Sequence, residues 1–162
     1  MTGHDNRDAI ARGMDDWVVI GLGQPLGGDD SVGLQVARRL AGEGVEARQC
    51  TDASALLPLL EAGRSVILVD GVVCEQAPGS VFVLQPAELG QRATALSSHG
   101  LGVAEVLALA QTLYGAAMQR VRIVGIAIEP PGRAAESLSP AVLRALAPAC
   151  DVVRALLAEE RN

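Results

Sequence analysis

Short apolar runs along the chain alternate with segments in which apolar residues recur every three or four positions. Five of these runs predict β-strands, because they are short and are flanked by turn-forming or acidic residues. They cover residues 17–21, 45–50, 65–70, 80–84 and 121–128. The run from Ser65 to Asp70 is apolar almost throughout, which is typical of a central strand, whereas the more polar run at 45–50 is expected at an edge of the sheet.

Segments with helical periodicity predict four helices between and after these strands. They begin or end near glycine or proline and cover about residues 29–42, 53–62, 101–114 and 140–157. The third helix is expected to bury one stripe, made of Val103, Val106, Leu107, Ala110 and Leu113. The strand at 80–84 follows its predecessor too closely for a helical crossover, so it is expected to run antiparallel. This order predicts an α/β fold, a three-layer α/β/α sandwich around a five-stranded, mostly parallel mixed sheet with one antiparallel strand.

The chain length and composition fit one domain of ordinary size. The protein has 162 residues, of which 49% are hydrophobic but only 2% aromatic. Such a core consists of Val, Leu, Ile and Ala, the usual filling of a parallel sheet covered by helices. We expect a flexible N-terminal tail at residues 1–15 and a single domain at residues 16–162.

Charge and cysteine content argue against several classes of protein. The net charge is −6 and no basic stripe is present, so nucleic acid is not expected as a partner. No apolar run approaches the roughly 18 residues needed to span a bilayer, and the first sixteen residues lack a signal-peptide core. Three widely spaced cysteines indicate reduced thiols, and therefore a cytoplasmic protein without membrane association.

Acidic residues and a histidine follow the predicted strands, where sites in open α/β sheets lie. Asp29 and Asp30 come after the first strand, Asp70 ends the third, and His99 precedes the third helix. An acid directly after a buried strand is costly unless it is paired or bound, so Asp70 is best explained by function. Taken singly, Asp30 is slightly better explained as a solvated acid in the first turn of a helix, and His99 is better explained as a hydrogen-bonded structural residue. Asp29 is best explained as a helix cap.

Two carboxylates and one imidazole at a single edge would suit a divalent transition metal ion with open coordination positions. Such an ion polarises a carbonyl group or lowers the pKa of a bound water. The residues alone make this site a hypothesis.

The glycine-rich loop has a rival interpretation as a dinucleotide-binding turn. Gly21 and Gly23 fit the start of that fingerprint, but Leu26 stands where a third glycine belongs. Asp52, which would have to bind the ribose, lies 31 residues beyond Gly21. Two acids at the start of the helix would also repel a pyrophosphate, so nucleotide binding is not expected.

Four short motifs follow one another along the chain. They are GLGQPLGGDDSVG at 21–33, ILVDG at 67–71, SSHGL at 97–101 and GIAIEP at 125–130. Taken together and in this order, they resemble the motifs of the hydrogenase maturation protease family. The resemblance extends over about residues 17–158.

The resemblance implies both an activity and a set of site residues. Asp30, Asp70 and His99 would bind the metal, and Asp30 and Asp70 would also be catalytic. The implied reaction is one endopeptidase cut, which removes the C-terminal extension from the precursor of a nickel–iron hydrogenase large subunit after nickel insertion. The precursor would supply the nickel, and no organic cofactor is implied.

Two positions depart from the family signature. Gln24 stands where the signature has asparagine, and Ser31 stands where it often has glycine. The alternative function is therefore a non-catalytic maturation chaperone on the same fold, which would bind nickel or the precursor.

Overall fold

A computed structural model describes residues 16–89, 95–96, 102–130 and 136–160 of the chain. Its centre is a mixed sheet with the strand order β2-β1-β3-β6-β4. Strands β1, β2, β3 and β6 pair in parallel, whereas β4 pairs antiparallel with β6. The strands are β1 (Trp17–Leu22), β2 (Ala47–Cys50), β3 (Ser65–Val73), β4 (Val81–Leu84) and β6 (Val121–Ile128).

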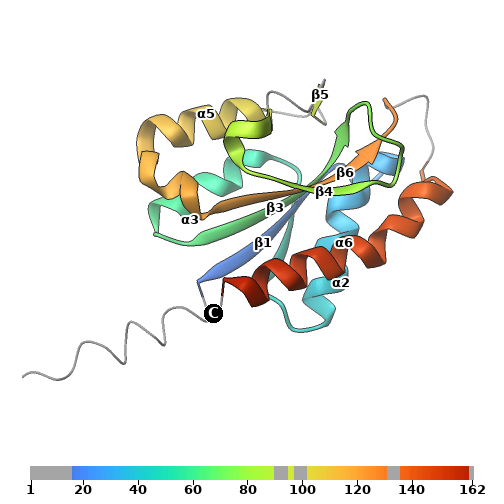
Figure 1. Cartoon of the computed structure of the whole chain (residues 1–162), viewed down its shortest axis with the longest axis horizontal. Coiled ribbons are helices and arrows are strands. Elements are labelled where there is room, and N and C mark those ends of the chain that lie inside the picture. Colours follow the sequence, from blue (N-terminus) through green and yellow to red (C-terminus); the bar gives the residue numbers. More distant parts are fainter. Residues whose placement is uncertain (1–15, 90–94, 97–101, 131–135, 161–162) are drawn as a thin grey trace, which may run out of the picture.

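Helices cover both faces of this sheet. Helices α2 (Val32–Gly42) and α6 (Pro140–Glu159) lie on one face, and α3 (Leu56–Glu61) and α5 (Val103–Tyr114) lie on the other (Figure 1). Short 3-10 turns lead into or out of helices. They are η1 (Gly28–Ser31), η2 (Ala53–Ala55), η3 (Pro86–Glu88) and η4 (Gly115–Arg120). The predicted three-layer α/β/α sandwich is therefore confirmed. In the part of the chain that the structure describes, no helix is long and apolar enough to cross a membrane.

The five predicted strands are all present, with small differences in their bounds. β2 lies at an edge and β3 at the centre, and β4 is antiparallel, as their sequences predict. β3 continues three residues beyond Asp70, to Val73. One element was not predicted, the two-residue strand β5 (Ala95–Leu96), which pairs antiparallel with the end of β3.

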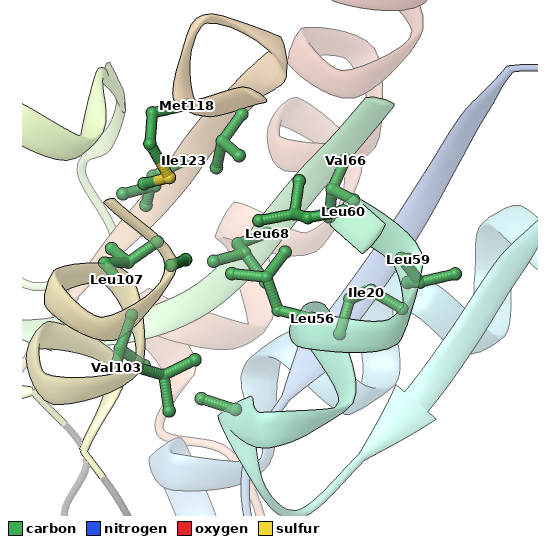
Figure 2. Packing of buried hydrophobic residues seen from close by; sticks show 14 of the residues in the cluster. Ile20, Leu56, Leu59, Leu60, Val66, Leu68, Val103, Leu107, Met118 and Ile123 are labelled. Atoms are coloured by element: carbon green, nitrogen blue, oxygen red, sulfur yellow. The ribbon is translucent and has the colours of Figure 1, made fainter. Parts of the chain in front are cut away.

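Alternate residues of each central strand pack into two separate hydrophobic layers. Ile20 and Leu68 face α3 and α5, where they meet Leu56 and Leu107 (Figure 2). The intervening residues of the same strands, such as Ile67, pack against α2 and α6. Burying a side chain of this size stabilises the fold by about 1.5–3 kcal/mol. The two layers together hold the strand ends in register.

The prediction that Leu113 is buried on α5 is wrong. Val103, Val106, Leu107 and Ala110 are buried, but Leu113 is 56% exposed. The next position on the stripe is occupied by Tyr114, which packs against the core in its place. The buried stripe therefore continues from Ala110 to Tyr114, four residues further on, and not to Leu113, because the aromatic ring covers more apolar surface.

The parallel register brings the carboxyl ends of three strands to one edge of the sheet. Gly21 of β1 pairs with Val69 of β3, and Asp70 pairs with Gly125 of β6. The predicted flexible tail at residues 1–15 lies outside the described residues. The carboxyl edge of the sheet is where the candidate chemistry gathers.

Candidate active site

Asp30 is held by the loop that leaves β1. Gln24 donates its main-chain N–H to the carbonyl oxygen of Asp30 at 3.2 Å, and the N–H of Asp30 donates to Gly27 O at 3.1 Å. Gly23 allows this close approach, because a Cβ atom there would lie 2.2 Å from the carbonyl oxygen of Asp30. The glycines thus allow the loop to pack closely against the backbone of Asp30.

The start of α2 brings Asp30 to the end of β3. Gly33 lies so close to the two central strands that a Cβ atom would meet the carbonyl oxygens of Leu22 and Val69 at 2.3 Å each. Val69 directly precedes Asp70, and the η1 turn that carries Asp30 contacts β3. The two acids that were predicted to meet are therefore at the same edge of the sheet.

Both carboxyl groups are almost completely buried. Asp30 is 3% exposed and Asp70 is 2% exposed, and they are two of only four buried polar or charged residues among those described. Burying a carboxylate costs several kcal/mol unless hydrogen bonds, charges or a bound ion compensate. Such an arrangement is typical of a functional site rather than of a structural one. This burial excludes the interpretation of Asp30 as a solvated surface acid.

Asp29 has a different role from its neighbour. Its Oδ1 atom accepts a hydrogen bond of 2.6 Å from the main-chain N–H of Ser139, the residue that caps α6. Asp29 was expected to cap the helix that follows it, and this expectation is wrong, because neither η1 nor α2 has a side-chain cap. The two neighbouring acids therefore differ in role: Asp29 joins the η1 turn to the start of α6, whereas Asp30 is buried at the carboxyl edge of the sheet.

The two departures from the family signature leave the loop undisturbed. Ser31 has φ −90° and ψ −2°, which any residue adopts, so glycine is not needed there. Its hydroxyl donates to Gly28 O at 2.7 Å and accepts a bond from Gln35 at 3.0 Å. Gln24 closes the loop through its main chain, since its carbonyl oxygen also accepts the N–H of Gly27. The side chain at position 24 is not required for that closure.

Residues at the end of β2 border the same edge. The carbonyl oxygen of Cys50 accepts the N–H of Gly23 at 3.3 Å. Burial raises the pKa of the Cys50 thiol, so at neutral pH this group is protonated and a poor nucleophile. Asp52 accepts a 2.7 Å bond from the N–H of Ser54, and this bond lowers the pKa of the Asp52 carboxyl group. Asp52 thus caps η2, and this structural role accounts for an acid at position 52 without a bound ribose.

The third predicted ligand, His99, lies outside the described residues. The structure therefore places Asp30 and Asp70 at one edge of the sheet, and a shared site of both with His99 stays a prediction. Within the described ranges, no group of three or more histidine, cysteine, aspartate or glutamate residues is arranged to hold a metal ion.

Fold and site together define the class of this protein. It is an α/β protein with two buried acids near the carboxyl ends of its central strands, Asp30 after β1 and Asp70 within β3, and enzymes of this architecture place their active sites at that edge. A family model described as "Hydrogenase maturation protease" matches residues 50–156. The chain belongs to the hydrogenase maturation protease family.

Solved structures with the same fold carry related names. A [NiFe] hydrogenase maturation protease HybD from Thermococcus kodakarensis has a TM-score of 0.67 and 21% identity, over 87% of this chain and 98% of that one. The hydrogenase maturating endopeptidase HybD from E. coli has a TM-score of 0.65 and 24% identity, over 88% and 92%. A hydrogenase 2 maturation peptidase from Thaumarchaeota archaeon SCGC_AB-539-E09 has a TM-score of 0.60 and 26% identity, over 87% and 97%. A search of curated proteins found no match.

Proposed function

We propose that this protein is the endopeptidase that removes the C-terminal extension from the precursor of a nickel–iron hydrogenase large subunit after nickel insertion. Membership of a protease family supports a hydrolytic cut. One observation carries the assignment of the site: Asp30 and Asp70 are both buried at the carboxyl edge of the sheet. The three free cysteines support a reducing compartment, and we place the reaction in the cytoplasm.

The nickel ion belongs to the substrate in this proposal. Asp30 and Asp70 offer carboxylate oxygens, and His99 would add an imidazole nitrogen. This mixture of oxygen and nitrogen ligands suits a divalent transition ion that keeps open positions. Bound beside the scissile peptide, nickel supplies Lewis-acid polarisation of the carbonyl group or of a water molecule. No organic cofactor is part of the proposal.

The reaction is a direct attack by water. Cys50 and Cys150 have pKa values raised by burial, which disfavours a thiolate nucleophile. Asp30 or Asp70 would accept a proton from the water as its oxygen adds to the scissile carbonyl carbon. The peptide C–N bond then breaks, and the departing amine takes up that proton. The products are the shortened large subunit, with a new terminal carboxylate, and the released peptide.

A processing assay tests the proposal. The purified protein is incubated with nickel-loaded and with nickel-free large-subunit precursor, and the intact mass of the precursor is measured over time. We expect a C-terminal peptide to be lost only from the loaded precursor. Stable binding without any loss of mass would overturn the endopeptidase function and favour the maturation chaperone. Equal cleavage of both precursors would refute nickel as the recognised element.

A further inference from the structure

A leucine stands out on the surface of the site loop. Leu26 is 78% exposed, more than any other large hydrophobic residue in the described ranges. It belongs to neither of the two hydrophobic layers. Its side chain therefore contributes nothing to the packing of the core.

The other exposed leucines differ from Leu26 in their local setting. Leu109 and Leu113 lie on α5 and Leu143 lies on α6. Leucine is a strong helix former, so helix propensity alone explains its presence at those positions. Turns instead favour Gly, Pro, Asn, Asp and Ser, so Leu26 gains nothing from its local conformation. Neither core packing nor helix propensity therefore accounts for a leucine at this position.

This turn is rigid and is joined directly to Asp30. The N–H of Gly27 donates to Gln24 O at 3.1 Å, with Pro25 as the first central residue of the turn. Proline fixes its own φ angle near −65° and so stiffens this position. A Cβ atom on Gly27 would lie 2.9 Å from the Cβ atom of Asp30, so the turn is packed against the acid. Leu26 is thus presented at a fixed place relative to the site, and little entropy would be lost when it binds.

We propose that Leu26 is a specificity-determining contact, which inserts into an apolar pocket on the folded large-subunit precursor beside the segment that is cut. The proposal rests on the function proposed above. The contact holds the precursor close to Asp30, because the turn that carries the leucine leads directly into the η1 turn that carries this acid. Burying an isolated leucine in such a pocket contributes to recognition and leaves the bond-breaking step unchanged.

Kinetics of the Leu26→Ala variant test this contact. With nickel-loaded precursor, KM is expected to rise about tenfold while kcat stays within about twofold, as for the loss of uniform binding. Leu26→Met keeps an apolar side chain of similar volume and is expected to restore KM. Leu113→Ala, which truncates an exposed leucine near the far end of α5, is the matched control and should leave both constants unchanged.

The outcomes separate this proposal from the proposed function. A KM for Leu26→Ala within twofold of the wild-type value would overturn the contact while leaving the protease function intact. If the wild-type protein fails to cut any loaded precursor, the protease function fails instead. In that case the Kd for the loaded precursor, compared between wild type and Leu26→Ala, still decides the contact: about tenfold weaker binding supports it and equal binding refutes it.

Discussion

The parallel strands begin at one side of the central sheet, the amino edge, and end at the opposite side, the carboxyl edge. Charged residues are placed differently at these two edges. At the amino edge, acids lie at the surface beside arginine: Arg64 binds Glu46 at 2.6 Å, and Arg122 binds Glu160 at 3.0 Å. The side chain of Glu46 is 44% exposed. At the carboxyl edge, Asp30 and Asp70 are at most 3% exposed. The first arrangement is inexpensive to build, whereas the second is costly and needs a function to explain it.

The contrast extends to the backbone. At the amino edge, long arginine side chains bridge neighbouring segments, as where Arg120 donates to the carbonyl oxygen of Gly63 at 2.6 Å. At the carboxyl edge, Gly23 and Gly33 bring backbone segments so close that no side chain fits between them. Substitutions at the carboxyl edge should therefore affect catalysis or folding strongly, and those at the amino edge only weakly.

Among variants that keep Asp70, the largest effect is expected for Asp30→Asn. The amide keeps the size of the side chain but removes the charge that would bind nickel and accept a proton. The processing rate should fall by at least about 100-fold. The midpoint of thermal unfolding should change little, because a buried charge is replaced by a neutral group. A rate within tenfold of the wild-type rate would remove Asp30 from the reaction.

Gly33→Ala should destabilise the fold most. The added methyl group would meet two carbonyl oxygens at 2.3 Å, and backbone cannot move aside easily. We expect the free energy of unfolding, measured in urea, to fall by about 3 kcal/mol. Gly42→Ala on the same helix is the matched control, since nothing lies within 4 Å of a Cβ atom there. It should stabilise the protein by roughly 0.5 kcal/mol, and a loss in both variants would contradict the steric explanation.

Asp29→Ala tests whether Asp29 has a structural role while its neighbour Asp30 has the catalytic one. It removes the hydrogen bond to Ser139 and leaves that N–H at the start of α6 without this acceptor. The free energy of unfolding should fall by about 1–2 kcal/mol. Processing at low temperature should continue at a rate close to that of the wild type. If instead Asp29→Ala is stable and inactive, the two neighbouring acids have been assigned the wrong way round.

The smallest effect is expected at the amino edge. The hydrogen bond from Arg64 holds the pKa of Glu46 below its ordinary value of 4.5. Its ion pair therefore stabilises the protein above pH 4.5, and the stabilisation disappears as the pH falls through the lowered pKa. Glu46→Gln should reduce the free energy of unfolding at pH 7 by under about 0.5 kcal/mol. Urea titrations of both proteins at pH 7 and pH 3 should converge at the lower pH, and a difference that grows on acidification would contradict this sign.

Sequence patterns predicted those helices and strands whose structure is determined by residues close together in the chain. β6 has its predicted bounds, because eight residues between Arg120 and Glu129 include a single charged side chain. β5 was missed, since two residues carry no periodicity. Leu113 was misplaced because α5 is apolar on several sides, and only the packing of Tyr114 shows which stripe continues.

The site was predictable to the same extent. Asp70 was singled out because it directly follows an apolar run, although β3 continues past it to Val73, and Asp30 was expected at the same edge of the parallel sheet, where it lies. The partner of Asp29 was out of reach, because Ser139 lies 110 residues away and no local pattern links the two. Nor does sequence tell which residue of a turn points to solvent, so Leu26 emerged only from its exposure in the fold.

The most direct test of the account is the rate at which Asp70→Asn processes nickel-loaded precursor, measured by intact mass beside the wild type. Asp70 is buried at the centre of the carboxyl edge, and its replacement keeps the shape of the side chain. The account predicts no detectable loss of the C-terminal peptide from a variant whose thermal unfolding matches that of the wild type. Cleavage at the wild-type rate by such a folded variant would contradict it.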